Sequence, residues 1–407
     1  MRRAHRPDRE ARAFLRWFNL SSQRPVDAYS LPQQRALWRL VALAFGRRMP
    51  VTVTERTIDG PTGPIALRIF SAGHRETPAP AFLWCHGGGF VVGGLDSADS
   101  ICRSIASIAG CTVIAVRYRL APEHALSAGR EDFLAALEWV AANGETLGID
   151  GSRLAIGGDS AGGNITAAVA QETLRRGGPA LRLQVLAYPA TDLLREFPSK
   201  AENAEGFMVT AQMLEHVRDT VGTAADAADP WLSPARSQDL RGLAPAVLIS
   251  AGYDPIRDDG LDYAERLRTA GVPVELLHYA GQFHGFLNFD AVIGAGRDAL
   301  RRIGDALANA FGTAHAIDRT IEISDASPDA LCTTLAVHAD IAATALTGWI
   351  AAERWAEVLL RQISPEVAGL FGLLLQPPLM PAVLARSDLM SRLGPLAARQ
   401  TYPAGTT

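Results

Sequence analysis

The chain has 407 residues, of which 48% are hydrophobic, and a formal net charge of -4 at pH 7. This length exceeds the usual size of one domain and allows a large buried core. The near-balanced charge gives no overall electrostatic field that would attract nucleic acid. We therefore expect a main domain with additions and no nucleic-acid partner.

Cysteine content and the first residues bear on the compartment. The four cysteines, Cys85, Cys102, Cys111 and Cys332, show neither paired nor metal-like spacing, which suits a reducing environment. Charged side chains interrupt residues 8–16, so no apolar core of an export signal is present there. We expect a cytoplasmic protein.

The first 48 residues combine helical patterning with eleven arginines against three acidic residues. Apolar side chains at residues 14–18 and 37–43, interrupted by Pro25 and Pro32, predict two exposed amphipathic helices. The arginine-rich faces leave two roles open, which are covering a pocket and binding an anionic membrane surface.

From residue 51 the pattern changes to that of a sheet. Alternating residues at 52–57 and 65–70 predict a hairpin across a Gly/Pro-rich turn. Short apolar runs follow, separated mostly by helical stretches, and this alternation predicts a parallel α/β sheet. The runs lie at residues 81–85, 112–116, 154–156, 183–188, 246–250 and 274–279.

Two parts of the chain depart from this alternation. The connection between residues 189 and 240 is too long for a simple loop and predicts an inserted subdomain. The sheet is expected to end with a helix at residues 297–311, before an Ala/Leu-rich tail with helix starts at Ser327 and Ser364. We expect the tail to dock on the main domain, with self-association and an interfacial anchor as alternatives. Prolines within residues 367–385 argue against a membrane span.

Residues 158–162, Gly-Asp-Ser-Ala-Gly, stand between an apolar strand and a helix-forming run. They fit G-x-S-x-G, in which the serine sits on a strained strand-to-helix turn and its hydroxyl is exposed as a nucleophile. The glycines occupy positions where a Cβ would clash between strand and helix. Alone, the motif would equally fit a glycine-rich turn without catalytic function. Residues at the ends of other strands are therefore needed to distinguish the two interpretations.

Open α/β sheets place their sites at the carboxyl ends of the strands, and three strand ends carry partners for Ser160. Residues 86–89, His-Gly-Gly-Gly, follow the first apolar run and can offer backbone amides, but they match no dinucleotide or phosphate loop. Asp254 and His284 follow the last two runs. The chain order of serine, aspartate and histidine is the order found in α/β-hydrolases.

These residue types suit acyl transfer by a covalent mechanism. His284 would take the proton of Ser160 as its hydroxyl attacks an ester carbonyl, and Asp254 would orient the imidazole and stabilise its cation. This chemistry requires neither metal nor cofactor. The expected donors to the tetrahedral oxyanion are the backbone amides of Gly87, Gly88 and Ala161.

The motifs resemble those of the hormone-sensitive lipase-like carboxylesterases, bacterial lipase family IV, in the branch with Gly-Asp-Ser-Ala-Gly. The resemblance covers roughly residues 1 to 312, whereas residues 313–407 are not typical of the family. Residues 125–129 depart from it, because they replace a proline-containing stretch. The matching segments are residues 86–89, 118–123, 158–164, 202–206, 254–258 and 284–286.

The resemblance implies an α/β-hydrolase fold with a helical cap over an acyl and alcohol pocket, and hydrolysis of short- to medium-chain esters. In this division residues 1–48 and 191–235 form the cap, residues 49–190 and 236–312 the core, and residues 313–407 an extra helical C-terminal extension.

Other functions of the same fold remain open at this stage. Some relatives have lost the histidine and bind small molecules without catalysis, and the presence of His284 argues against that role. A lactonase, an amide deacetylase or a serine peptidase would use the same residues, because fold and triad do not choose the acyl substrate. A small-molecule ester is the expected partner, and a homo-oligomer remains open.

Overall fold

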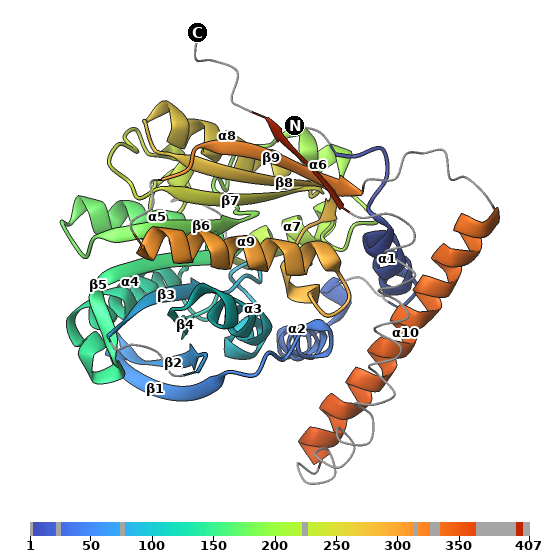
Figure 1. Cartoon of the computed structure of the whole chain (residues 1–407), viewed down its shortest axis with the longest axis horizontal. Coiled ribbons are helices and arrows are strands. Elements are labelled where there is room, and N and C mark those ends of the chain that lie inside the picture. Colours follow the sequence, from blue (N-terminus) through green and yellow to red (C-terminus); the bar gives the residue numbers. More distant parts are fainter. Residues whose placement is uncertain are drawn as a thin grey trace.

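The computed structural model describes residues 3–21, 26–73, 78–221, 227–312, 316–325, 334–363 and 396–401. Its described strands form one sheet in the order β1-β2-β4-β3-β5-β6-β7-β8-β9-β10 (Figure 1). All neighbours from β4 to β9 are parallel, while β1/β2, β2/β4 and β9/β10 are antiparallel. The predicted hairpin and the predicted parallel sheet are thus confirmed.

The first six strands are β1 (Thr52–Gly60), β2 (Gly63–Ser71), β3 (Ala79–Cys85), β4 (Thr112–Arg117), β5 (Ile149–Asp159) and β6 (Leu181–Ala187). They are followed by β7 (Ala246–Tyr253), β8 (Val274–Phe283), β9 (Arg319–Asp325) and β10 (Leu396–Thr401). Each of the six apolar runs singled out in the sequence lies in or at the end of one of these strands, because a parallel strand is buried on both faces.

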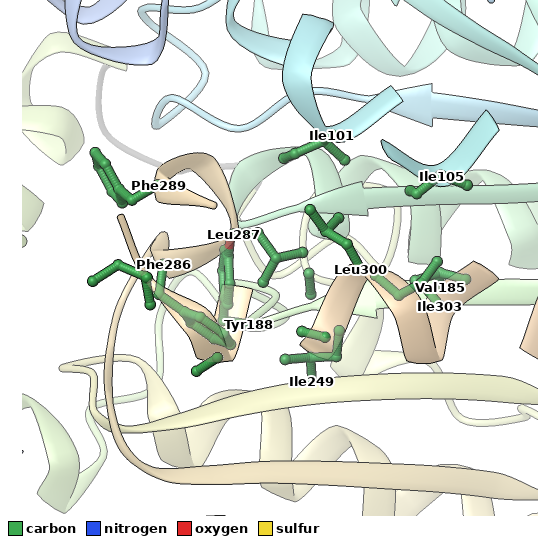
Figure 2. Close-up of a cluster of buried hydrophobic side chains, with 14 of the residues drawn as sticks. Ile101, Ile105, Val185, Tyr188, Ile249, Phe286, Leu287, Phe289, Leu300 and Ile303 are labelled. Atoms are coloured by element: carbon green, nitrogen blue, oxygen red, sulfur yellow. The ribbon is translucent and has the colours of Figure 1, made fainter. Parts of the chain in front are cut away.

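Helices cover both faces of the sheet. On one face pack α3 (Leu95–Ala109) and α9 (Gly294–Phe311), and on the other α4 (Leu126–Asn143), α5 (Ala161–Arg175) and α8 (Arg257–Thr269). Figure 2 shows the first of these interfaces, where side chains of α3 and α9 meet Val185 and Ile249 of the sheet. The apolar cluster continues into η4 (Phe286–Phe289), which Gly285 separates from His284.

The N-terminal segment contains α1 (Arg9–Ser21), η1 (Val26–Ala28) and α2 (Leu31–Phe45). The two predicted amphipathic helices are present, and the apolar inner face of α1 is buried. Phe14 is fully buried there, and its ring lies 5.4 Å from that of Phe283 and 4.6 Å from that of Phe289.

The connection between β6 and β7 contains α6 (Pro198–Glu202), α7 (Ala211–Val221) and η3 (Pro234–Arg236), as expected for an insertion. It touches the N-terminal segment at several points. Arg3 pairs with Glu202 at 3.0 Å, and the side-chain amide of Asn19 donates to the Gly206 carbonyl at 3.1 Å. These contacts join the two segments that the family resemblance assigns to a cap.

The C-terminal extension is not purely helical, which corrects the sequence prediction. Its strand β9 runs parallel to β8, so the sheet does not end with α9, and β10 pairs with β9. The helix α10 (Thr334–Ile363) lies against α1 and α2, where Arg354 donates to the Gly46 carbonyl at 3.1 Å (Figure 1). The predicted helix starts at Ser327 and Ser364, and residues 367–385, lie outside the described residues.

Within the described part of the chain, no helix combines the length and apolar character needed to cross a bilayer.

Candidate active site

Ser160 occupies the turn between β5 and α5 with φ 56° and ψ -119°, a left-handed conformation that a serine rarely adopts. The flanking glycines are sterically required. A Cβ on Gly158 would lie 2.5 Å from the Gly162 carbonyl carbon, and one on Gly162 would lie 2.1 Å from the Cys85 carbonyl oxygen. The strained strand-to-helix turn predicted from the motif is therefore present.

The structure brings Ser160, His284 and Asp254 together from three strand ends. Ser160 Oγ lies 2.8 Å from His284 Nε2, and His284 Nδ1 lies 2.8 Å from Asp254 Oδ2. The side chains of Asp254 and His284 are buried, while Ser160 is half-buried. These distances are within hydrogen-bond reach, so a proton can pass between serine and imidazole while the carboxylate holds the ring.

Hydrogen bonds hold both the side chain and the backbone carbonyl of Asp254 in place. Its Oδ1 accepts a hydrogen bond from the Ile256 amide at 2.8 Å, which leaves Oδ2 for His284. The buried Asn203, at the end of α6, donates to the Asp254 carbonyl at 3.0 Å and to the Gly252 carbonyl at 3.2 Å. Sequence reasoning gave Asn203 no role, although it lies in a segment that carried the family resemblance.

The imidazole of His284 packs on an aromatic residue that follows β6. The ring of Tyr188 lies 4.8 Å from that of His284, and Tyr188 also contacts Phe286 in the cluster of Figure 2. Its backbone is left-handed, with φ 36°, and its amide donates to the Ile249 carbonyl at 2.6 Å. Burial raises the pKa of the Tyr188 hydroxyl well above its usual range, so this neighbour of the histidine stays neutral.

The amide of Gly87, the first glycine of the loop after β3, is already hydrogen-bonded in the structure. The Gly87 amide donates to Asp159 Oδ1 at 2.9 Å, so this N–H is already engaged. A Cβ on Gly87 would meet the same carboxylate at 2.6 Å. Burial raises the pKa of Asp159, which also lies 3.4 Å from the Asn288 side-chain amide. This hydrogen bond fixes the loop and argues against the expectation that the Gly87 amide donates to an oxyanion.

The amides of Ala161 and of the later glycines in this loop differ from that of Gly87. Ala161 is the first residue of α5, so no carbonyl of its own helix accepts its N–H. The Gly88 carbonyl accepts hydrogen bonds from the amides of Val91 and Val92 at 3.0 and 2.9 Å. Because the peptide is planar and trans, the N–H of Gly89 points opposite to that carbonyl, away from these two residues. Sequence reasoning omitted Gly89, although the run of three glycines contains it.

Two other histidines near the site have structural surroundings. His86 is buried, its Nδ1 lies 2.8 Å from the Gly87 carbonyl oxygen, and its ring stacks on that of Tyr118. Burial lowers the pKa of His86 to about 4, so it is neutral at ordinary pH. His278 lies within β8, as expected, with its Nδ1 2.8 Å from Ser250 Oγ. Among the described residues, no group of three His, Cys, Asp or Glu side chains is arranged to hold a metal ion.

Comparisons with known proteins agree with this architecture. A family model described as alpha/beta hydrolase fold matches residues 82–288. Esterase LipI of Mycobacterium tuberculosis is 41% identical over 254 residues, which cover 61% of this chain and 79% of that protein. Ethyl acetate hydrolase of Pseudomonas putida is 38% identical over 253 residues, covering 62% of this chain and 80% of that protein. A thermostable esterase from Pseudomonas putida ECU1011 superposes with a TM-score of 0.73 at 31% identity, covering 76% of this chain and 99% of that chain.

A parallel sheet between two helical layers, with a serine on a strained turn after a central strand, defines an α/β-hydrolase fold. The chain belongs to the α/β-hydrolase family, among the hormone-sensitive lipase-like esterases, and it is a carboxylic ester hydrolase.

Proposed function

We propose that this chain hydrolyses short- to medium-chain carboxylic esters through a triad of Ser160, His284 and Asp254 and an acyl-enzyme intermediate. The observation that carries the proposal is the pair of 2.8 Å contacts that join the serine to the imidazole and the imidazole to the carboxylate. Neutral His284 accepts the hydroxyl proton while Ser160 Oγ attacks the ester carbonyl, and the Asp254 carboxylate stabilises the resulting imidazolium.

The imidazolium then gives its proton to the leaving alcohol, and an acyl ester remains on Ser160. Water attacks this ester in the second half of the reaction, with His284 again acting as base. The amides of Gly88, Gly89 and Ala161 are the proposed oxyanion donors, each of which lowers the barrier by about 3 kcal/mol. Asp159 supports these donors by fixing the Gly87 peptide at the start of the loop.

The acyl-chain preference is assigned to the segments above the loop. A Cβ on Gly89 would lie 2.8 Å from Cγ2 of Val217, so α7 lies directly over the proposed oxyanion donors. Little room for a long acyl group is expected between them. A relative that is 38% identical is an ethyl acetate hydrolase, which favours small esters for this chain also.

A panel of nitrophenyl esters with acyl chains of increasing length tests the proposal. We expect the highest kcat/KM for short and medium chains in the wild type, and a shift toward longer chains for Val217→Ala. Glu215→Ala, on the exposed side of α7, is the matched control and should leave the profile unchanged. Preferential turnover of a lactone or an acetamide would assign the same site to a different acyl substrate.

A further inference from the structure

Arg130 on α4 is a buried cation that the proposed mechanism does not use. Its side chain is fully shielded from solvent, and among the described residues the Asp229 carboxylate acts on its charge without forming a direct ion pair with it. Desolvation lowers the pKa of Arg130 to about 10, so the guanidinium remains charged at ordinary pH. Burying a cation without a direct ion pair costs folding free energy, which suggests that its position serves another purpose.

The guanidinium hydrogen-bonds to three separate parts of the chain. Nη2 donates to Asn164 Oδ1 and, at 3.3 Å, to the Leu232 carbonyl at the end of the insertion. Nη1 donates to the Leu126 carbonyl at 2.6 Å, at the start of α4. Because the donors of a guanidinium form a rigid planar fork, these acceptors are held at fixed relative positions.

Asn164 passes this restraint to the nucleophile. Its side-chain amide donates to the carbonyls of Ala190 and Leu232 at 2.5 and 2.9 Å, so it is held on both sides of the insertion. Its backbone amide donates to the Ser160 carbonyl at 3.1 Å, as the first helical bond of α5. Two hydrogen bonds therefore connect Arg130 to the main chain of Ser160.

The same guanidinium also supports the loop after β3. Its central carbon lies 5.2 Å from the centroid of the Phe90 ring, within the range of a cation–π contact. Phe90 directly follows Gly89, and its backbone is left-handed, with φ 65°. The Phe90 carbonyl accepts a hydrogen bond from the Ala121 amide at 2.9 Å, which ties the loop to the segment before α4.

The geometry points to Arg130 as a positioning residue that sets the relative placement of the nucleophile turn and the oxyanion loop. This inference rests on the proposed function of Ser160 and of the Gly88 and Gly89 amides. Errors of about 1 Å in such placement reduce the rate of the chemical step roughly 100-fold. Substrate affinity depends on other contacts, so a loss at Arg130 should appear in kcat rather than in KM.

The test compares Arg130→Met, which keeps an unbranched apolar side chain without the guanidinium and its donors, with Arg130→Lys, which keeps the charge without the fork. For both variants we measure kcat and KM on nitrophenyl acetate, the rate of fluorophosphonate labelling, and the melting temperature. We expect kcat and the labelling rate to fall together by roughly 10- to 100-fold, with KM within about threefold of wild type. Arg68→Met removes a half-buried guanidinium on β2 and should change neither rate.

A folded Arg130→Met protein with kcat and labelling within twofold of wild type would overturn the inference, since the residue would then serve stability alone. If Arg130→Met does not fold, Arg130→Lys decides by the same criteria. Phe90→Leu combined with Arg130→Met should lose less than the product of the two single losses, because both act on one loop. A wild type without turnover or labelling would instead contradict the proposed function, and Ser160→Ala provides that reference.

Discussion

Asp159 and His86 illustrate how single residues around the serine shape the site without entering the chemistry. The Asp159 carboxylate accepts a hydrogen bond from the Gly87 amide and thereby orients the loop that follows β3. His86, the residue before Gly87, is buried against Tyr118. The Tyr118 hydroxyl donates a hydrogen bond to the His86 carbonyl at 2.8 Å. Both side chains are buried polar groups with fixed hydrogen-bond partners. Replacing either one should therefore lower the free energy of unfolding as well as the rate of turnover.

His86 makes stability depend on pH. Burial lowers its pKa from 6.5 to about 4, so the unfolded chain binds a proton at a pH where the folded chain does not. The contribution of neutral His86 to the free energy of unfolding is fully present above pH 6.5 and is lost as pH falls toward 4. The total loss over this range is about 3 kcal/mol.

We therefore expect His86→Asn to have a lower unfolding free energy at pH 7 but a weaker decline toward pH 4.5, measured by urea unfolding. His124→Asn, at an exposed histidine, is the control and should follow the wild type. An equally steep decline in His86→Asn and wild type would contradict this role of His86.

At the scale of elements, α1 and the residue before it support the end of β8, which His284 directly follows. Phe14 packs on Phe283, the residue before His284, and the buried Asp8 accepts a hydrogen bond from Gln282 at 2.7 Å. The Asp8 amide also donates to the Gly281 carbonyl at 2.8 Å. The N-terminal segment should therefore affect the placement of His284 as well as access to the site.

Phe14→Ala should destabilise the protein by about 3–5 kcal/mol, because it removes a fully buried ring and leaves a cavity beside β8. Leu20→Ala, at a side chain that is 70% exposed on the same helix, should cost less than about 0.5 kcal/mol. Denaturant unfolding of the two variants provides the comparison. Equal effects would show that α1 does not pack on β8 in solution.

Periodicity predicted the elements whose burial follows from their own residues. The hairpin and six buried strands were expected because alternating or continuous apolar runs report the faces that a strand buries. Strand β9 was missed because its seven residues, Arg-Thr-Ile-Glu-Ile-Ser-Asp, stand in a tail with strong helical composition. Its partner β8 lies far away in the sequence, and pairing of that kind leaves no local signal.

The sequence also predicted part of the candidate site. Strand ends and chain order indicated Ser160, Asp254 and His284, because each follows an apolar run that a parallel sheet aligns at one edge. The choice among the glycines of residues 87–89 was not predictable. It depends on which amide the Asp159 carboxylate accepts and on the left-handed backbone of Gly89, neither of which is visible in a run of identical residues.

At the scale of the whole molecule, this chain contains more residues than those that superpose on its structural relatives. The Pseudomonas esterase is covered over 99% of its length, yet only 76% of this chain takes part in the superposition. Strand β9 continues the sheet beyond β8, with Ile321 and Ile323 buried, and α10 packs on the N-terminal helices. Cytoplasmic location, self-association and contact of the arginine-rich helices with a membrane surface remain predictions.

Two truncations separate the roles of these elements. A chain ending at residue 312 exposes the outer edge of β8, whereas a chain ending at residue 325 keeps β9 on that edge. We expect both to turn over a small ester, because the proposed triad precedes residue 312, and only the shorter chain to aggregate or melt earlier. Size-exclusion chromatography and thermal unfolding provide the comparison. Identical behaviour of the two chains would show that β9 does not protect the edge.

The central claim is that Ser160 is the nucleophile activated by His284, and covalent labelling tests it most directly. Wild-type protein treated with a fluorophosphonate should gain the mass of one phosphonyl group, which peptide mapping places on Ser160. Ser160→Ala should remain unlabelled and lose turnover roughly a millionfold, and His284→Gln should label far more slowly. Labelling of another residue, or undiminished labelling of Ser160→Ala, would contradict the account.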